Sequence, residues 1–240
     1  MRASNSPDAG NRTPVRVRVW DLPLRLFHWL LVLCLVGSFV TIKVGGSWTD
    51  WHFRFGYTAL ALIVFRILWG LVGPRYARFS SFVFSPAAIF AYLGNTAGAP
   101  RTLGHSPLGA LSVFALIAVV AVQAAAGLFT SDDVSMEGPL ARLVSSAAVE
   151  RASWLHHVNE LIILGLIGLH LAAILYYRAF RRQSLVRPML TGDKVVAPDP
   201  ATPDPASLAA HDGTATRWRA VVVAVLAVAA VTAIVNWPFF

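Results

Sequence analysis

Five long apolar segments, separated by shorter polar or basic stretches, dominate the pattern of this 240-residue chain. They cover approximately residues 26–42, 52–72, 108–129, 154–177 and 220–237. Each is long enough to cross the hydrocarbon core of a bilayer, about 30 Å thick, as one helix. The pattern predicts an all-α integral membrane protein, with a four-helix transmembrane bundle and an additional C-terminal transmembrane helix.

The composition supports this fold class. Hydrophobic residues make up 56% of the chain and charged residues only 13%, whereas soluble domains carry about a quarter charged residues. The net charge of +8 resides in the segments between the apolar stretches, which indicates topology signals and contacts with lipid head groups rather than nucleic-acid binding. The single cysteine, Cys34, forms no disulfide within the chain, and the absence of a C-x-x-C-H motif excludes covalently attached haem.

Four parts are expected along the chain: a cytoplasmic N-terminal segment (1–19), the bundle (20–191), a cytoplasmic linker (192–216) and the fifth helix (217–240). The linker is rich in Pro, Ala, Asp and Thr, a composition typical of a solvated segment without a core. The fifth helix contains no histidine. It is therefore expected to be an appendage to a four-helix functional unit.

The distribution of basic residues predicts the orientation. They concentrate before the first apolar segment, after the second and after the fourth: Arg2, Arg12, Arg16, Arg18, Arg25; Arg75, Arg78, Arg101; Arg178, Arg181, Arg182, Arg187 and Lys194. The alternate loops mix basic and acidic residues: Lys43, Asp50; Asp132, Asp133, Glu137, Arg142, Glu150 and Arg151. The positive-inside rule then places the N-terminus in the cytoplasm and the C-terminus outside.

Four histidines lie at matched depths on three of the predicted helices: His28, His52, His156 and His170. His156 and His170 are 14 residues apart on one helix, which is about 21 Å along the axis and about 40° in angle. Imidazole at membrane depth is unfavourable unless it has a partner. With the predicted topology, depth pairs His28 with His170 near the inner surface and His52 with His156 near the outer one.

Each pair is expected to hold the iron of one non-covalent haem through bis-histidine ligation, which suits electron transfer. Arg66, near the inner surface, and Arg25, one turn before His28, are candidate partners of haem propionates; the alternative for both is an arginine that snorkels to the interface. A zinc or copper site is the main rival, but these helices offer few carboxylates. Glu160 is the exception, and it is expected to orient His156 through a ring nitrogen.

The remaining histidines have other expected roles. His157 is about 220° around the helix from His170 and is expected to face away from the ligands. His105 opens the third apolar segment, either as a helix-start residue or beside a quinone or a haem propionate. His211 is expected to be solvated in the linker.

Several stretches resemble the bacterial cytochrome b561 family, which includes b-type subunits of nickel–iron hydrogenases. The resemblance covers roughly residues 15–194 and is carried by WDLPLRLFHW at 20–29, RILWGLVGPRYARF at 66–79, GHSPLGAL at 104–111 and the paired histidines of the fourth apolar segment, followed by YYR and LVRPMLTG. It implies a four-helix bundle with two b haems and, residue by residue, His28, His52, His156 and His170 as ligands. The chain departs from the family pattern at His157, where Glu is usual, and in its fifth helix.

The resemblance implies transmembrane electron transfer in the bacterial inner membrane, between the quinone pool and a redox partner such as a cytochrome c or a dehydrogenase or hydrogenase subunit. One variant is a quinol oxidase that passes electrons to oxygen or superoxide. The alternatives of another class are a haem-free metal or proton transporter and a structural membrane anchor. The expected partners also include membrane lipids and a second copy of the chain in a homodimer.

Overall fold

The computed structural model describes residues 14–94, 96, 102–132, 136–196 and 205–237. Within this part, five helices are long and apolar enough to cross a membrane. They are α1 (Leu22–Val44), α2 (Thr49–Val72), α4 (Pro107–Gly127), α5 (Ser146–Ala179) and α7 (Thr214–Asn236). The predicted all-α, multi-pass membrane fold is confirmed.

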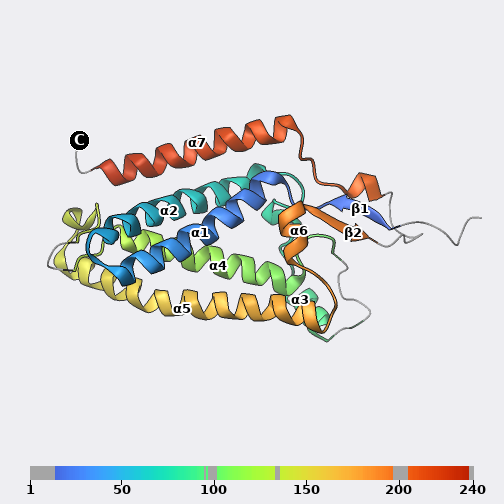
Figure 1. Ribbon diagram of the computed structural model, residues 1–240, viewed down its shortest axis with the longest axis horizontal. Coiled ribbons are helices and arrows are strands. Elements are labelled where there is room, and N and C mark those ends of the chain that lie inside the picture. The colour runs from blue at the N-terminus through green and yellow to red at the C-terminus, as the bar shows by residue number, and fades with distance from the viewer. Residues whose placement is uncertain (1–13, 95, 97–101, 133–135, 197–204, 238–240) are drawn as a thin grey trace, which may run out of the picture.

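The long helices lie side by side, and their connections gather at the two ends of the bundle (Figure 1). Helix α2 packs along α1, α4 and α7, while α5 packs along α4. Ile63, Val120 and Ile163 form a small buried cluster where α2, α4 and α5 meet. Helices α1 and α5, by contrast, make little direct contact in the described chain, so they border a region between the α1–α2 pair and the α4–α5 pair.

Local signals at the helix starts explain where the elements begin. The N-cap side chains of Asp21 and Ser106 accept hydrogen bonds from the amides of Leu24 and Gly109, and a proline occupies the first turn of both helices. Ser85 caps the short helix α3 (Pro86–Leu93) in the same way. Proline fits the first turn because an amide there has no intrahelical acceptor. These caps begin α1 and α4 close to their predicted starts.

Helix α5 is longer than predicted. It begins at Ser146, eight residues before the predicted apolar run, and its 34 residues span about 51 Å. The additional turns contain Glu150 and Arg151, which an apolar pattern does not detect. Since this length exceeds the hydrocarbon core of about 30 Å, α5 projects beyond the membrane.

A two-stranded antiparallel ribbon joins the segment just before residue 20 to the segment just after residue 191, the bounds predicted for the bundle. Strand β1 (Val15–Arg18) pairs with β2 (Asp193–Val196), which directly follows the short helix α6 (Val186–Thr191). Arg18 pairs with Asp193 in the ribbon and, at 2.8 Å, with Asp212. We refer to this end of the molecule as the ribbon end and to the opposite end, with the 3-10 helix η1 (Gly46–Trp48), as the η1 end.

The segment 192–216, expected as a solvated linker, is fixed at several points where it is described. Besides strand β2, the amide of Ala210 donates to the Arg18 carbonyl at 2.7 Å, and the Tyr76 hydroxyl donates to the Leu208 carbonyl at 2.8 Å. His211 is exposed, as expected. Residues 1–13 and 197–204 of the expected terminal segment and linker lie outside the described residues.

The fifth transmembrane helix, α7, packs against the bundle. Small residues, Ala220 and Ala227 among them, are buried in the same core cluster as Phe65 and Trp69 of α2. The Asp212 carboxylate, just before α7, accepts a hydrogen bond from the amide of Leu22, at the start of α1. Helix α7 thus covers α2 on the side away from α5 (Figure 1).

Candidate functional site

The His52–His156 pair lies near the η1 end, where α2 and α5 approach one another. The two imidazole centroids are 6.3 Å apart, and the ring planes are 81° apart. Two metal–imidazole bonds of about 2 Å each, together with the distance from each nitrogen to its ring centre, account for a separation of this size. The spacing of the pair is therefore the one that a single metal ion shared by two imidazoles would need.

Backbone carbonyls fix both rings of this pair. The Nδ1 atom of His52 lies 2.9 Å from both the carbonyl oxygen and the Oγ of Ser38, and the Nδ1 atom of His156 lies 3.0 Å from the Gln123 carbonyl oxygen. An Nδ1–H group that donates to a carbonyl leaves Nε2 unprotonated and available to a metal. The tautomer with the proton on Nδ1 satisfies both carbonyls and leaves both Nε2 atoms free for a metal.

Glu160 does not make the contact predicted for it. Its carboxylate forms an ion pair with Lys43 of α1 at 3.1 Å, while His156 finds its partner in the Gln123 carbonyl of α4. The sequence favoured Glu160 because it stands one turn from His156. A backbone acceptor, which any residue offers, carries no such signal.

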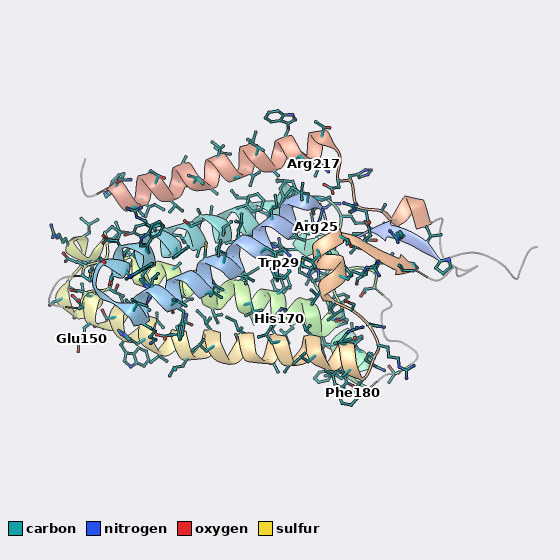
Figure 2. The ribbon with its side chains drawn as sticks, in the orientation of Figure 1. Arg25, Trp29, Glu150, His170, Phe180 and Arg217 are labelled. Carbon is teal, nitrogen blue, oxygen red and sulfur yellow. The ribbon has the colours of Figure 1, made fainter. Side chains whose placement is uncertain are left out.

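The His28–His170 pair lies nearer the ribbon end, between α1 and α5. The two imidazoles are close enough for their charges to interact, and His170 lies on the side of α5 that faces α1 and α4 (Figure 2). The Nδ1 atom of His28 is buried and has no hydrogen-bond partner among the described residues. Unlike His52 and His156, His28 therefore has no carbonyl in the described structure that orients its ring through Nδ1.

Glycines leave space beside the helices that carry the four histidines. A Cβ atom built on Gly56, Gly165 or Gly168 would meet no other atom within 4 Å. Gly56 stands one turn after His52, and Gly168 is two residues before His170. Gly165 and Gly168 are exposed and do not share the face of His170, whereas Gly56, four residues after His52, lies on the same face of α2 as that histidine. The open position at Gly56 is therefore the one that adjoins a histidine pair.

His157 is separated from both pairs. It is exposed, and its Nδ1 atom lies 2.7 Å from the Ser153 carbonyl oxygen of the preceding turn. Its ring meets His156 only edge-on, at a centroid distance of 6.4 Å. This placement agrees with the prediction that His157 faces away from His170, about 220° around the helix.

Arg66 is held inside the protein. Its side chain is 2% exposed, donates to the Ala77 carbonyl at 3.2 Å and lies over the Phe79 ring at 4.6 Å. The guanidinium is thus directed towards the loop after α2 and is covered there by protein rather than exposed. Arg66 stands two turns from the ribbon end of α2, on the half of the bundle that contains the His28–His170 pair.

Arg25 lies between α1 and α6 (Figure 2). One terminal nitrogen donates to the Leu190 carbonyl at 2.5 Å, and its Nε atom is buried without a partner in the described chain. Trp29, one turn further along α1, donates to the neighbouring Met189 carbonyl at 3.3 Å. Arg25 thus links α1 to α6 and keeps a buried N–H group available to an anion.

His105 is an aromatic component of the ribbon end. Its ring lies 4.6 Å from Trp20 and 4.3 Å from Phe82, centroid to centroid, and its Nδ1 atom is buried without a partner among the described residues. Lys194 of β2 donates to the Leu103 and Gly104 carbonyls beside it. Burial, reinforced by the charges of Arg66 and Lys194, lowers the pKa of His105 to about 3, so this histidine is neutral at physiological pH.

We expect His105 to make the protein acid-sensitive. Its pKa is lowered in the folded state, so the unfolded chain binds the proton first and stability falls as the pH drops from about 6.5 towards about 3. His105→Phe preserves the ring contacts and should reduce this loss. The loss of stability is measured as the difference between the thermal unfolding midpoints in detergent at neutral pH and at a pH of about 4. His211→Phe, at an exposed position, is the control; an unchanged acid sensitivity in His105→Phe contradicts the assignment.

Two polar residues inside the apolar segments, Gln123 and Asn159, were not predicted as site residues. Asn159 is 3% exposed and donates to the Gln123 side chain at 2.8 Å. Polar side chains at membrane depth are expensive without partners, so their presence in the apolar runs was a usable signal. The identity of their partners required the packing of α4 against α5.

A family model described as prokaryotic cytochrome b561 matches residues 19–192. The matched range contains α1 to α6, all four paired histidines, Arg25 and Arg66, and it ends before α7. No curated protein and no solved structure matches the chain significantly.

Proposed function

Since the chain belongs to the prokaryotic cytochrome b561 family, whose members carry electrons across a membrane through b-type haem, we propose that it holds two b haems and exchanges electrons between membrane quinone and a redox partner. A cytochrome c or a dehydrogenase or hydrogenase subunit suits the role of partner. The four-helix part, residues 20–191, is the electron-transferring unit. The fifth helix lies outside the ligand set.

The observation that carries this proposal is the His52–His156 pair, with ring centroids 6.3 Å apart and each Nδ1 within hydrogen-bond distance of a backbone carbonyl. We assign this pair to the outer haem iron. The His28–His170 pair, with the unpartnered nitrogen of His28, is assigned to the inner haem iron. Pairs of imidazoles suit axial ligation, whereas zinc in proteins usually takes three or four protein ligands.

Bound haem would supply one-electron chemistry at iron, and ligation by two imidazoles would leave no open position for oxygen. This favours electron transfer over the quinol-oxidase variant. The chain's own residues orient the rings through Ser38 and Gln123 and surround the site with apolar helix surface that excludes water. At the ribbon end, the buried guanidinium of Arg66 and the half-buried one of Arg25 offer positive charge to the propionates of the inner haem, which lowers the cost of placing anionic groups inside the bundle.

We assign the ribbon end to the cytoplasm of a bacterial inner membrane and the C-terminus to the periplasm. Described basic residues of the ribbon end support this orientation under the positive-inside rule, among them Arg16, Arg18, Arg25, Arg75, Arg78, Arg178, Arg181, Arg182, Arg187, Lys194, Arg217 and Arg219. Arg2, Arg12 and Arg101, and Asp133 of the opposite end, lie outside the described residues. Helix α1 begins and α7 ends at opposite ends of the bundle (Figure 1), as an odd number of crossings requires.

Haem content is the first test of this function. The purified, folded protein is expected to be red, with a b-type spectrum that sharpens on reduction and two haems per chain in a pyridine haemochrome assay. The expectation follows from two separate histidine pairs at two depths. A colourless folded protein would contradict the function altogether, and one haem per chain would contradict the assignment of two sites.

Electron transfer across the membrane is the second test. In vesicles that contain the haem-loaded protein and trapped ferricyanide, quinol added outside should reduce the ferricyanide, and protein-free vesicles should not. If the ferricyanide in vesicles with haem-loaded protein stays oxidised, the protein binds haem but does not transfer electrons across the membrane. Adding a cytochrome c outside pre-reduced vesicles then tests that partner directly.

A further inference from the structure

Helix α4 contributes no histidine to either pair, yet it forms the surface against which His156 rests. The Gln123 carbonyl oxygen lies 3.0 Å from the Nδ1 of His156. A Cβ atom on Gly127 would lie 3.1 Å from the Cε1 and 3.3 Å from the Nδ1 of the same ring. Gln123 and Gly127 are four residues apart and share one face of α4, so the absence of a side chain at Gly127 allows the imidazole to approach the Gln123 carbonyl.

A buried amide from α5 fixes this part of α4. Asn159 stands one turn after His156, is 3% exposed, and donates through Nδ2 to the Gln123 side chain and to the Val119 carbonyl, both at 2.8 Å. No bulk water reaches this depth of a membrane to replace these hydrogen bonds. Asn159 therefore fixes the position of α4 against α5 at the level of His156.

We propose that Gln123, Gly127 and Asn159 are positioning residues for His156, and that α4 through them sets the potential of the haem bound by the His52–His156 pair. This rests on the proposed function. A carbonyl that accepts the Nδ1–H bond makes the coordinating nitrogen more basic. A more basic axial ligand stabilises ferric over ferrous iron and so lowers the potential.

The second histidine pair provides an internal reference. The Nδ1 of His28 has no hydrogen-bond partner among the described residues, and neither Gln123 nor Asn159 contacts the His28–His170 pair through a hydrogen bond of the described structure. A change at Gln123 or Gly127 of α4, or at Asn159 of α5, should therefore shift the potential of the haem bound by the His52–His156 pair and leave that of the other haem unchanged. A general loss of folding would affect both.

The experiment is a redox titration of the purified, haem-loaded protein carrying Gly127→Ala or Asn159→Leu. Each change should weaken the bond between His156 and Gln123 and raise the potential of the His52–His156 haem. We expect the ratio of reduced to oxidised haem at the wild-type midpoint to rise about tenfold, equivalent to about 59 mV for a one-electron couple. The same variants in a His170→Ala background identify which signal belongs to this haem.

Electron paramagnetic resonance gives an independent readout. The low-spin ferric signal depends on the angle between the two axial ring planes, which is 81° for His52 and His156. Gly127→Ala should shift that signal because the added methyl group displaces the His156 ring. The matched control is Leu161→Ala, two residues from Asn159 on the exposed side of α5 at 70% exposure; it should leave both potentials and the signal unchanged.

A double variant tests whether Asn159 acts through Gln123. Gln123→Leu removes the side-chain acceptor of Asn159 but keeps the backbone carbonyl that holds His156. If Asn159 acts through Gln123, the double variant should shift the potential of the His52–His156 haem no further than Gln123→Leu alone. If Asn159→Leu loses the haem and cannot be titrated, the proposal is tested with Gly127→Ala, which adds only one methyl group. Unshifted potentials and an unshifted resonance signal in haem-loaded Gly127→Ala and Asn159→Leu overturn the proposal, as do equal shifts of both haems. A wild-type protein that does not bind two haems would instead contradict the proposed function.

Discussion

Replacing His170 by alanine is expected to halve the haem content of the purified protein, from two haems per chain to one. His170 on α5 and His28 on α1 lie close enough for their charges to interact, and we propose that they hold one haem together. Alanine removes one of two axial bonds, and a non-covalent haem depends on both. The haem that remains should show the spectrum and the potential of the site at the opposite end. Pyridine haemochrome analysis and a redox titration measure both quantities.

Three further variants make this result specific. His28→Ala should leave the same haem as His170→Ala, because the two residues share one site. His52→Ala should leave the other haem. His157→Ala should retain both, since its ring is exposed and is bonded within its own helix. Retention of two haems in His170→Ala, or loss of one in His157→Ala, would falsify the ligand assignment.

The second large effect is expected at Asp21, where replacement by alanine should destabilise the protein by on the order of 2–4 kcal/mol. The carboxylate is fully buried, caps α1 through the Leu24 amide at 2.9 Å and accepts the indole N–H of Trp69 at 3.1 Å. Alanine removes the cap and leaves the buried Trp69 donor without a partner. Unfolding of the haem-loaded protein by heat or by a denaturing detergent measures the loss.

Asp21→Asn is the matched control, because its amide oxygen can accept both hydrogen bonds without a charge. Burial, reinforced by the charge of Asp212, raises the pKa of Asp21 above 3.8. The folded state therefore binds the proton more tightly, and the contribution of Asp21 to stability declines as the pH rises from about 3.8 through its raised pKa. Asp21→Asn should lack this decline and stay close to the wild type in acid. A stability equal to that of Asp21→Ala would contradict the role of the acceptor oxygen.

The transmembrane helices were predictable because their signal is local. An apolar run of sufficient length identifies a crossing, and a cap followed by proline, as at Ser106 and Pro107, fixes where a helix begins. The pairing of the histidines followed from depth alone, once loop charges had set the direction of each helix. The structure brings His52 together with His156, as that pairing requires.

What could not be predicted depends on contacts between distant segments. Strands β1 and β2 are four residues each and pair across most of the chain, so neither carries a recognisable signal by itself. The acceptor for His156 is a backbone carbonyl of α4, and every residue offers one. The close approach at Gly127 becomes visible only when the facing surfaces of α4 and α5 are known, because glycine is common in membrane helices.

Both histidine pairs take one member from α5, the fourth membrane crossing. During synthesis, a chain that has not yet reached Ser146 can present His28 and His52 but no second imidazole for either. Under the proposed ligation, both haem sites can therefore be completed only after α5 has been synthesised. Strand β2 (Asp193–Val196) follows α5 in the chain and pairs with β1, so the proposed ligands are all present before the ribbon can join the two ends of the bundle.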